Sequence, residues 1–276
     1  MRVCWNITNR CNEQCSFCFR DTSREELSLA DNLVIANKLI ESGVEHIAFS
    51  GGEALLYPYI DELISYIYSS NISTTLITNT LLLSYDRLLQ LSKHLDWLAI
   101  PIDSLQYIPG MRNKLHYQNV NQVLQMISPN MGLKVKINTV VTRMNYTMLN
   151  EIYQSVISRY PIIERWNLFE FSPLRDTSEE NKYIFEIDSQ IDNIVESWLH
   201  QLNAKHSKLS IKYKHQYTLE NAYVVIAPNG DVVSNSTTHH LAGNLLYDSV
   251  DRILSNLKMN ESIYLRRTAD APILII

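Results

Sequence analysis

The chain has 276 residues, of which 46% are hydrophobic and 19% are charged, so it can build a sizeable core and is not globally disordered. The net charge of −5 argues against broad binding to nucleic acid. No apolar run approaches the roughly 20 residues that a membrane-spanning helix needs, so we expect no membrane partner.

The N-terminus and the cysteines indicate a reducing compartment. The opening MRVCWNIT has neither a basic n-region nor an apolar h-region, so it does not resemble a signal peptide. The cysteines are clustered near the N-terminus and have no partners later in the chain, unlike a disulfide framework. We therefore expect the protein to work in the cytoplasm.

Strand-like and helix-like segments alternate along residues 1–175. Short apolar or β-branched runs predict strands at 3–7, 46–50, 74–78, 97–102, 134–141 and 166–171. Helical periodicity predicts helices at 28–43, 59–70, 84–93, 119–127 and 147–159, the first of them capped by Ser28. This alternation predicts an α/β fold, a partial (β/α)6 barrel of the TIM type, with its chemistry at the C-terminal ends of the strands.

The pattern changes after residue 175. We expect a polar loop at 176–183, a helix at 188–203, two strands within 223–234 around a Pro-Asn-Gly-Asp turn, and a short helix at 249–257. The sequence therefore divides into a barrel, residues 1–175, and a small C-terminal extension, residues 176–276, that caps it.

Three cysteines, Cys11, Cys15 and Cys18, follow a C-x3-C-x2-C spacing. A zinc site would normally have four ligands, and no second C-x2-C pair exists, so a His or Asp would have to complete it. A disulfide would leave one thiol over. A four-iron cluster held by three cysteines would leave one iron open to an outside ligand. Cys4 is not expected to take part.

The cysteine loop resembles the signature of radical S-adenosylmethionine (SAM) enzymes, including the aromatic Phe17 before the last cysteine. The segment SGGEALL (50–56) is similar to the GGE motif of that superfamily, whose glycines let the backbone approach the amino acid part of SAM. The resemblance implies a [4Fe–4S] cluster on the three cysteines. It also implies SAM contacts from the residues of these motifs and from polar groups at the next strand ends: Phe17, Ser50, Gly51, Gly52, Glu53, Asn79, Asp103 and Ser104.

This resemblance implies the chemistry of the superfamily. The open iron binds SAM, one electron from the reduced cluster cleaves its sulfonium, and a 5′-deoxyadenosyl radical abstracts hydrogen from a substrate. It also implies an external electron donor such as flavodoxin or ferredoxin. Because the sequence has no cysteine after Cys18, we expect a single cluster.

A narrower resemblance is to viperin-like enzymes, which dehydrate a nucleotide such as CTP to a 3′-deoxy-3′,4′-didehydro product. It rests on VKINTVVTRMN (135–145), ERWNLFEF (164–171) and NAYVVIAPNG (221–230). It implies that Lys136, Asn138 and Arg165 bind the nucleotide and that Tyr223 lies near the reacting ribose. We expect the first three at the ends of the fifth and sixth strands, facing the same mouth as the cysteine loop.

Two departures leave an alternative open. Asn167 stands where viperin-like enzymes have a lysine that binds phosphate. The C-terminal tail, which has no cysteine, also resembles the degenerate cluster-binding (SPASM or twitch) extensions of peptide maturases. The alternative is therefore an enzyme that modifies a peptide or protein without auxiliary clusters.

Overall fold

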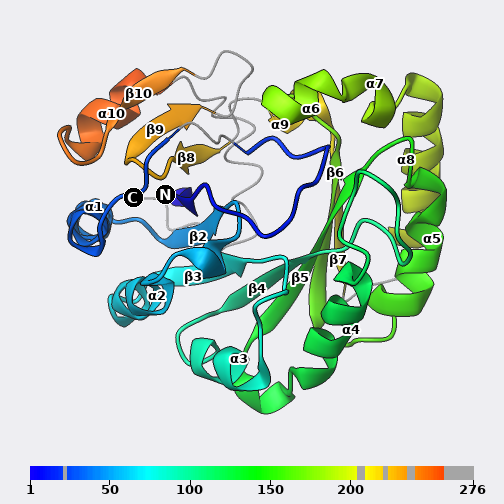
Figure 1. The fold of residues 1–276 in the computed structure, drawn as a ribbon, viewed down its shortest axis with the longest axis horizontal. Helices are drawn as coiled ribbons and strands as arrows, with labels where there is room; N and C mark the ends of the chain where they lie inside the picture. The colour runs from blue at the N-terminus through cyan, green and yellow to red at the C-terminus, as the bar shows by residue number, and fades with distance from the viewer. Residues whose placement is uncertain (21–23, 204–208, 220–222, 235–239, 258–276) are drawn as a thin grey trace.

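In the computed structural model, residues 1–20, 24–203, 209–219, 223–234 and 240–257 are described. Within these residues, ten strands form one sheet in the order β10-β9-β8-β1-β2-β3-β4-β5-β6-β7 (Figure 1). Their bounds are β1 (Arg2–Thr8), β2 (His46–Gly51), β3 (Ser73–Ile77), β4 (Trp97–Pro101), β5 (Lys134–Val141), β6 (Ile163–Glu170), β7 (Ser210–Lys214), β8 (Val224–Ile226), β9 (Asp231–Ser234) and β10 (Leu241–Asn244).

The sheet is a curved, incompletely closed parallel barrel, as expected for the α/β fold. Strand β8 and strands β1 to β7 run parallel, whereas β9 and β10 are antiparallel additions at one edge. The six expected strands are present. The segment after residue 175 adds β7 and β8 to the two ends of this parallel array, so it belongs to the same sheet.

Helices lie along the outer side of the sheet (Figure 1). The helix α1 begins after Ser28, whose side chain accepts a hydrogen bond from the Asp31 N–H, as the sequence predicts. None of the helices in the described part of the chain is long and apolar enough to cross a membrane. The helices are α1 (Leu29–Glu41), α2 (Ile60–Ser69), α3 (Tyr85–Leu91), α4 (His116–Met126), α5 (Leu149–Ile152), α6 (Asp176–Glu180), α7 (Lys182–Phe185), α8 (Ser189–Asn203), α9 (Gln216–Leu219) and α10 (Val250–Asn256).

Short turns of other helical types complete the elements: η1 (Ala54–Leu56), η2 (Pro129–Met131), η3 (Tyr146–Met148) and η4 (Tyr153–Ile157). The helix expected at 147–159 is thus a composite, because η3, α5 and the π-helical turn η4 follow one another there.

Alternation along each strand separates two faces of the sheet. On β5, Val135, Ile137 and Thr139 are fully buried. Val135 and Ile137 belong to the same hydrophobic core as the buried side chains of the helices. Lys136 and Asn138 point the other way, because successive side chains of a strand alternate in direction. We call this second face, turned away from the helices, the inner face.

For the segment after residue 175, one expectation is wrong and one strand was not predicted. The polar stretch 176–183, predicted as a loop, contains α6 and the start of α7. Phe185 at the end of α7 packs against Phe17 and Phe171 in a second, small core, and this tertiary contact holds a segment whose sequence is polar. The strand β7 is absent from the prediction because Ile211 is its only buried residue.

Candidate active site

The cysteine loop, residues 9–20, follows β1 and is fixed to two neighbouring loops by backbone hydrogen bonds. Gly52 N–H donates to the Thr8 carbonyl and Glu53 N–H to the Arg10 carbonyl, each at 2.8 Å. Ser16 N–H donates to the Gly110 carbonyl, also at 2.8 Å. The structure therefore brings the cysteine loop and the GGE motif together, as the sequence predicts.

The glycines of the GGE motif are required by this contact. A Cβ atom on Gly52 would lie 2.2 Å from the Arg10 carbonyl oxygen, and one on Gly51 would lie 2.3 Å from that of Thr8. Gly51 also has φ of +137°, which side chains rarely adopt. The clash at Gly52 is with the backbone just before Cys11. A side chain there would displace the cysteine loop itself, in addition to any effect on the space for SAM.

The carboxylate of Glu53 is buried and joins the ends of β2 and β3. Its oxygens accept hydrogen bonds from the Thr78 hydroxyl and the Asn79 N–H, both at 2.7 Å, and from Leu55 N–H at 3.0 Å. Asn79 in turn donates from Nδ2 to Oδ1 of Asn12 in the cysteine loop at 2.6 Å. Glu53 and Asn79 thus position the cofactor-facing loops, and their direct contact with SAM stays a prediction.

The three cysteines are free and partly buried. Burial raises the pKa of the Cys11 thiol, and raises that of Cys15 to about 12, while the nearby Cys18 adds to both shifts. Buried thiols gathered in this way are suited to a metal centre, whose positive charge removes their protons on binding.

Their number and chemistry fit an iron–sulfur cluster. Three thiolates can hold three irons of a four-iron cluster and leave the fourth iron open to an outside ligand. The three sulfurs do not all lie within 4.8 Å of one another, so they are not drawn around a single point in this structure.

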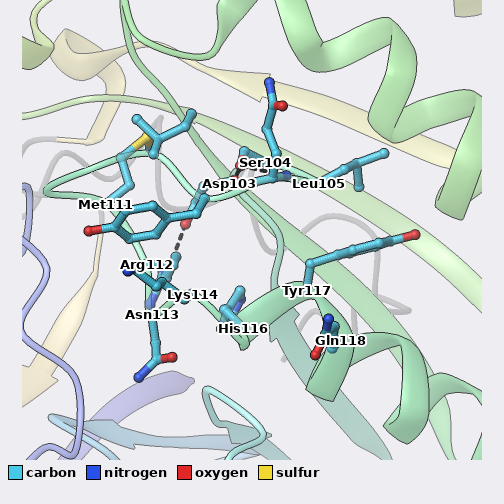
Figure 2. A pocket seen from close by; sticks show the side chains of 13 residues that line it. Asp103, Ser104, Leu105, Met111, Arg112, Asn113, Lys114, His116, Tyr117 and Gln118 are labelled. Atoms are coloured by element: carbon cyan, nitrogen blue, oxygen red, sulfur yellow. Dashed lines mark hydrogen bonds and ion pairs between the residues drawn. The ribbon is translucent and has the colours of Figure 1, made fainter.

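A buried charge network that the sequence analysis missed lies beside Cys15. Arg112 donates to Asp103 at 2.7 Å (Figure 2). It also donates to Glu13 at 3.2 Å, and its Nη1 lies 3.8 Å from the Cys15 sulfur. Burial would raise the pKa of Glu13, but the His116 ring, whose Nδ1 lies 3.6 Å away, and the charge of Arg112 lower it to about 2. Arg112 therefore places a fixed positive charge near the predicted cluster.

The cavity in Figure 2 adjoins this network but is small. Its volume of about 110 Å³ is well below the roughly 300 to 1,000 Å³ of ligand pockets, so it is too small for a nucleotide. Ser104 lines it and hydrogen-bonds to the Gln106 carbonyl. Asp103, fully buried, also accepts from the Val140 N–H at 2.7 Å, so both residues hold the loop after β4 in place.

The two remaining residues predicted to contact SAM differ in setting. Phe17 is buried, with its ring 5.1 Å from the Arg112 guanidinium carbon and edge-on to Phe185, so it anchors the cysteine loop in the small core. Ser50 is the fifth residue of β2 and pairs in register with Asn6 of β1.

The predicted substrate residues share the inner face but not the predicted position. Lys136 and Arg165 pair directly, each as the third residue of its strand, so they lie in the first halves of β5 and β6 and not at the C-terminal ends. The predicted strand bounds, 134–141 and 166–171, already put both residues near the N-terminal ends of their strands, so the expected position came from the resemblance and not from the strand pattern. Asn138 pairs with Asn167 one pleat further on, and the Asn167 amide donates to its Oδ1 at 3.0 Å.

Positive charges crowd this part of the inner face. The Arg165 guanidinium carbon and the Lys136 Nζ lie 5.2 Å and 5.8 Å from the centre of the Trp97 ring. Burial, followed by the charge of Arg165, lowers the pKa of Lys136 from 10.5 to about 7. Its Nζ donates to the Thr75 hydroxyl at 3.3 Å, a neutral partner. The arrangement favours an anionic ligand.

Tyr223 precedes β8 and contacts the other open edge of the barrel. Its hydroxyl lies 3.3 Å from Nζ of Lys214, the last residue of β7. No strand pairing joins β7 and β8 in the described residues, so these side chains approach across the gap in the barrel.

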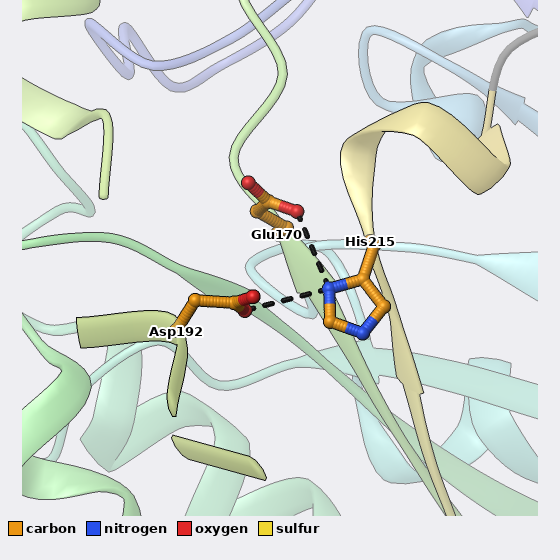
Figure 3. Close-up of side chains that lie close together, drawn as sticks. All are labelled: Glu170, Asp192 and His215. Atoms are coloured by element: carbon orange, nitrogen blue, oxygen red, sulfur yellow. Dashed lines mark ion pairs between the residues drawn. The ribbon is translucent and has the colours of Figure 1, made fainter. Parts of the chain in front are cut away.

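A second cluster of titratable groups, Glu170, Asp192 and His215, lies where β6, β7 and α8 meet (Figure 3). The Nδ1 atom of His215 is 3.6 Å from Glu170 and 3.4 Å from Asp192, and its Nε2 is 3.0 Å from Glu196. These close contacts link α8 to the ends of β6 and β7, and the buried Nδ1 of His215 makes no hydrogen bond within the described residues.

Comparison with known proteins agrees with this geometry. The model of the Radical SAM superfamily matches residues 5–156. A Flammeovirga pacifica protein described as an S-adenosylmethionine-dependent nucleotide dehydratase is 31% identical over 270 residues, covering 91% of this chain and 86% of the relative. A Selenomonas ruminantium protein with the same description is 23% identical over 282 residues, covering 97% and 98%.

Among solved structures, Streptococcus suis SuiB bound to S-adenosylmethionine has a TM-score of 0.72 and 17% identity, covering 96% of this chain and 67% of SuiB. This likeness shows the fold. The family match spans more than half of the chain and includes β1, the cysteine loop and the GGE motif. The chain therefore belongs to the radical SAM superfamily, whose enzymes use a [4Fe–4S] cluster and S-adenosylmethionine.

Proposed function

We propose that this radical SAM enzyme acts on a nucleotide, whose phosphates bind the inner face of the barrel, and dehydrates its ribose to a 3′-deoxy-3′,4′-didehydro product. The observation that carries the proposal is the pair of neighbouring cations, Lys136 and Arg165, on a half-buried surface. Two adjacent positive charges repel each other and cost free energy unless an anion binds between them. The nucleotide dehydratase description of the relative at 31% identity supports the same substrate class.

Each group on the chain has a distinct task in this proposal. Cys11, Cys15 and Cys18 would hold the cluster, and the loop at Gly51 and Gly52 would receive the amino acid end of SAM. When bound, these cofactors supply the hydrogen-abstracting chemistry. The proposal includes an external one-electron donor such as a flavodoxin or a ferredoxin.

The substrate groups work through charge and hydrogen bonding. Arg165 presents a planar fork that matches phosphate oxygens, and Lys136 contributes a point charge. The amide pair of Asn138 and Asn167 is fixed by its own hydrogen bond and can orient polar groups of the ligand. Tyr223, with its hydroxyl beside Lys214, would give a hydrogen atom to the departing 3′-hydroxyl of the ribose radical, so that water leaves and the 3′,4′ double bond forms. The external one-electron donor would then re-reduce the tyrosyl radical, and a proton from solvent would restore the phenol.

The test measures 5′-deoxyadenosine formed by the anaerobically reconstituted, reduced enzyme with SAM and each nucleotide in turn. We expect one or more nucleoside triphosphates to raise its formation well above the uncoupled background. Arg165→Ala should remove this stimulation, whereas Lys93→Gln, an exposed lysine after α3, should keep it. Stimulation by a peptide and by no nucleotide would instead support the peptide-modifying alternative.

A further inference from the structure

The strand β7, which the sequence analysis did not predict, places Lys212 opposite Asn167, a position where the resemblance to viperin-like enzymes implies a lysine. Strands β6 and β7 are parallel, with Asn167 opposite Lys212 and Phe169 opposite Lys214. Residues opposite each other on neighbouring strands project from the same face of a sheet. Lys212 and Asn167 therefore share a face.

The side chains of β7 show which face this is. Ile211 is buried in the main core, and the Tyr213 hydroxyl donates to Asp192 of α8 at 2.7 Å, so both point toward the helices. Lys214 points the opposite way, with its Nζ 4.5 Å from the centre of the Phe169 ring. By alternation, Lys212 lies with Lys214 on the inner face.

The side chain of Lys212 is long enough to place its ammonium group where that of a lysine at position 167 would lie. Neighbouring strands lie about 4.8 Å apart, and an extended lysine side chain, with bonds of about 1.5 Å, reaches about 6 Å from its Cα. The ammonium group of Lys212 can thus reach the space in front of Asn167. The amide of Asn167 is held aside by its hydrogen bond to Asn138.

Positive charges predominate on this face. The inward-facing described residues of β5, β6 and β7 include Lys136, Arg165, Lys212 and Lys214. The carboxylate of Glu164 lies at the N-terminal edge of this group, 3.9 Å from Nζ of Lys134 and away from Lys212 and Lys214. Such a row suits a chain of several phosphates, because each added phosphate brings further negative charge.

We propose that Lys212 supplies the phosphate-binding cation that is missing at Asn167, so that the inner face selects a nucleoside triphosphate over the corresponding mono- and diphosphates. This inference rests on the proposed function and deepens it. The phosphate-binding cation would lie on β7, at Lys212, and not at the opposite position on β6, which is Asn167.

The experiment measures equilibrium dissociation constants of nucleoside mono-, di- and triphosphates for the reconstituted enzyme with SAM, at equal iron content. Lys212→Gln should weaken triphosphate binding about ten- to a hundredfold, the usual effect of losing a charge-assisted hydrogen bond, and should reduce the preference over the diphosphate. Lys212→Arg should retain most of the affinity, and Lys93→Gln all of it. The swap Asn167→Lys with Lys212→Asn should restore binding that Lys212→Asn alone loses.

The outcomes separate the two proposals. Unchanged triphosphate affinity in Lys212→Gln, with the wild-type enzyme binding triphosphate, would overturn the role of Lys212 and leave the proposed function standing. Equal wild-type affinity for mono- and triphosphate would also overturn it. A wild-type enzyme that binds none of the nucleotides would overturn both. Should Lys212→Gln fail to fold, the swap variant decides, because failure to restore binding in a folded swap counts against the role.

Discussion

Lys136 should take up a proton when a nucleotide binds, because its pKa in the free protein is set by burial and by a neighbouring cation. Burial and Arg165 lower this pKa to about 7, so at pH 8 about nine molecules in ten carry a neutral amine there. A phosphate on the inner face would favour the charged form and raise the pKa toward its usual value of 10.5.

The size of the effect follows from this shift. Binding at pH 8 should take up about 0.9 proton per nucleotide, and affinity should fall about tenfold for each pH unit above 7 until the pKa of the complex is reached. Affinity falls with pH because Lys136 must take up a proton when the nucleotide binds. That uptake costs more free energy as the pH rises above the pKa of the free protein. Two titratable neighbours, His46 and Cys4, do not change charge near pH 8, because burial lowers the pKa of His46 to about 3 and raises that of Cys4 to about 11.

Isothermal titration calorimetry in buffers of different ionisation enthalpy measures this proton uptake directly. At pH 8 the terminal phosphate of the ligand is already ionised, so the signal reports the protein. Lys136→Gln should bind nucleotide more weakly, with little dependence on the buffer. A wild-type binding enthalpy that is the same in all buffers, in an enzyme that binds nucleotide, would refute the reasoning about Lys136.

Three further predictions concern the cofactor loops. Replacing Cys11, Cys15 or Cys18 with Ala should abolish iron binding, whereas Cys4→Ala should retain about four irons per chain, and an iron assay that finds eight would contradict a single cluster. Gly52→Val should lose iron as well as SAM binding, because its Cβ would lie 2.2 Å from the Arg10 carbonyl oxygen; full iron content in the folded variant would show that the loop tolerates the clash. Arg112→Gln should lower the midpoint potential of the cluster by on the order of tens of millivolts, because a positive charge near Cys15 favours the added electron; an unchanged potential in a redox titration followed by electron paramagnetic resonance would argue against this role.

The sequence by itself determined the features that depend on neighbouring residues. The alternation of apolar runs and helical periods predicted the strands β1 to β6 and the helices between them, because burial of a strand or helix leaves a local pattern. The cysteine loop and the GGE motif were found from short spacings. Their meeting was expected because the C-terminal ends of adjacent parallel strands lie at one edge of a sheet.

Only the tertiary structure decided the features that depend on residues far apart in the chain. Arg112 reaches Glu13 across 99 positions, and no local pattern records such a contact. β7 has a single buried residue, so it becomes a strand only through its pairing with β6. That pairing turns Lys212 toward the inner face beside Asn167, and our proposal that it binds phosphate rests on this register. The reason is physical: a strand is stabilised by its partners in the sheet, and its register with them sets which side chains share a face.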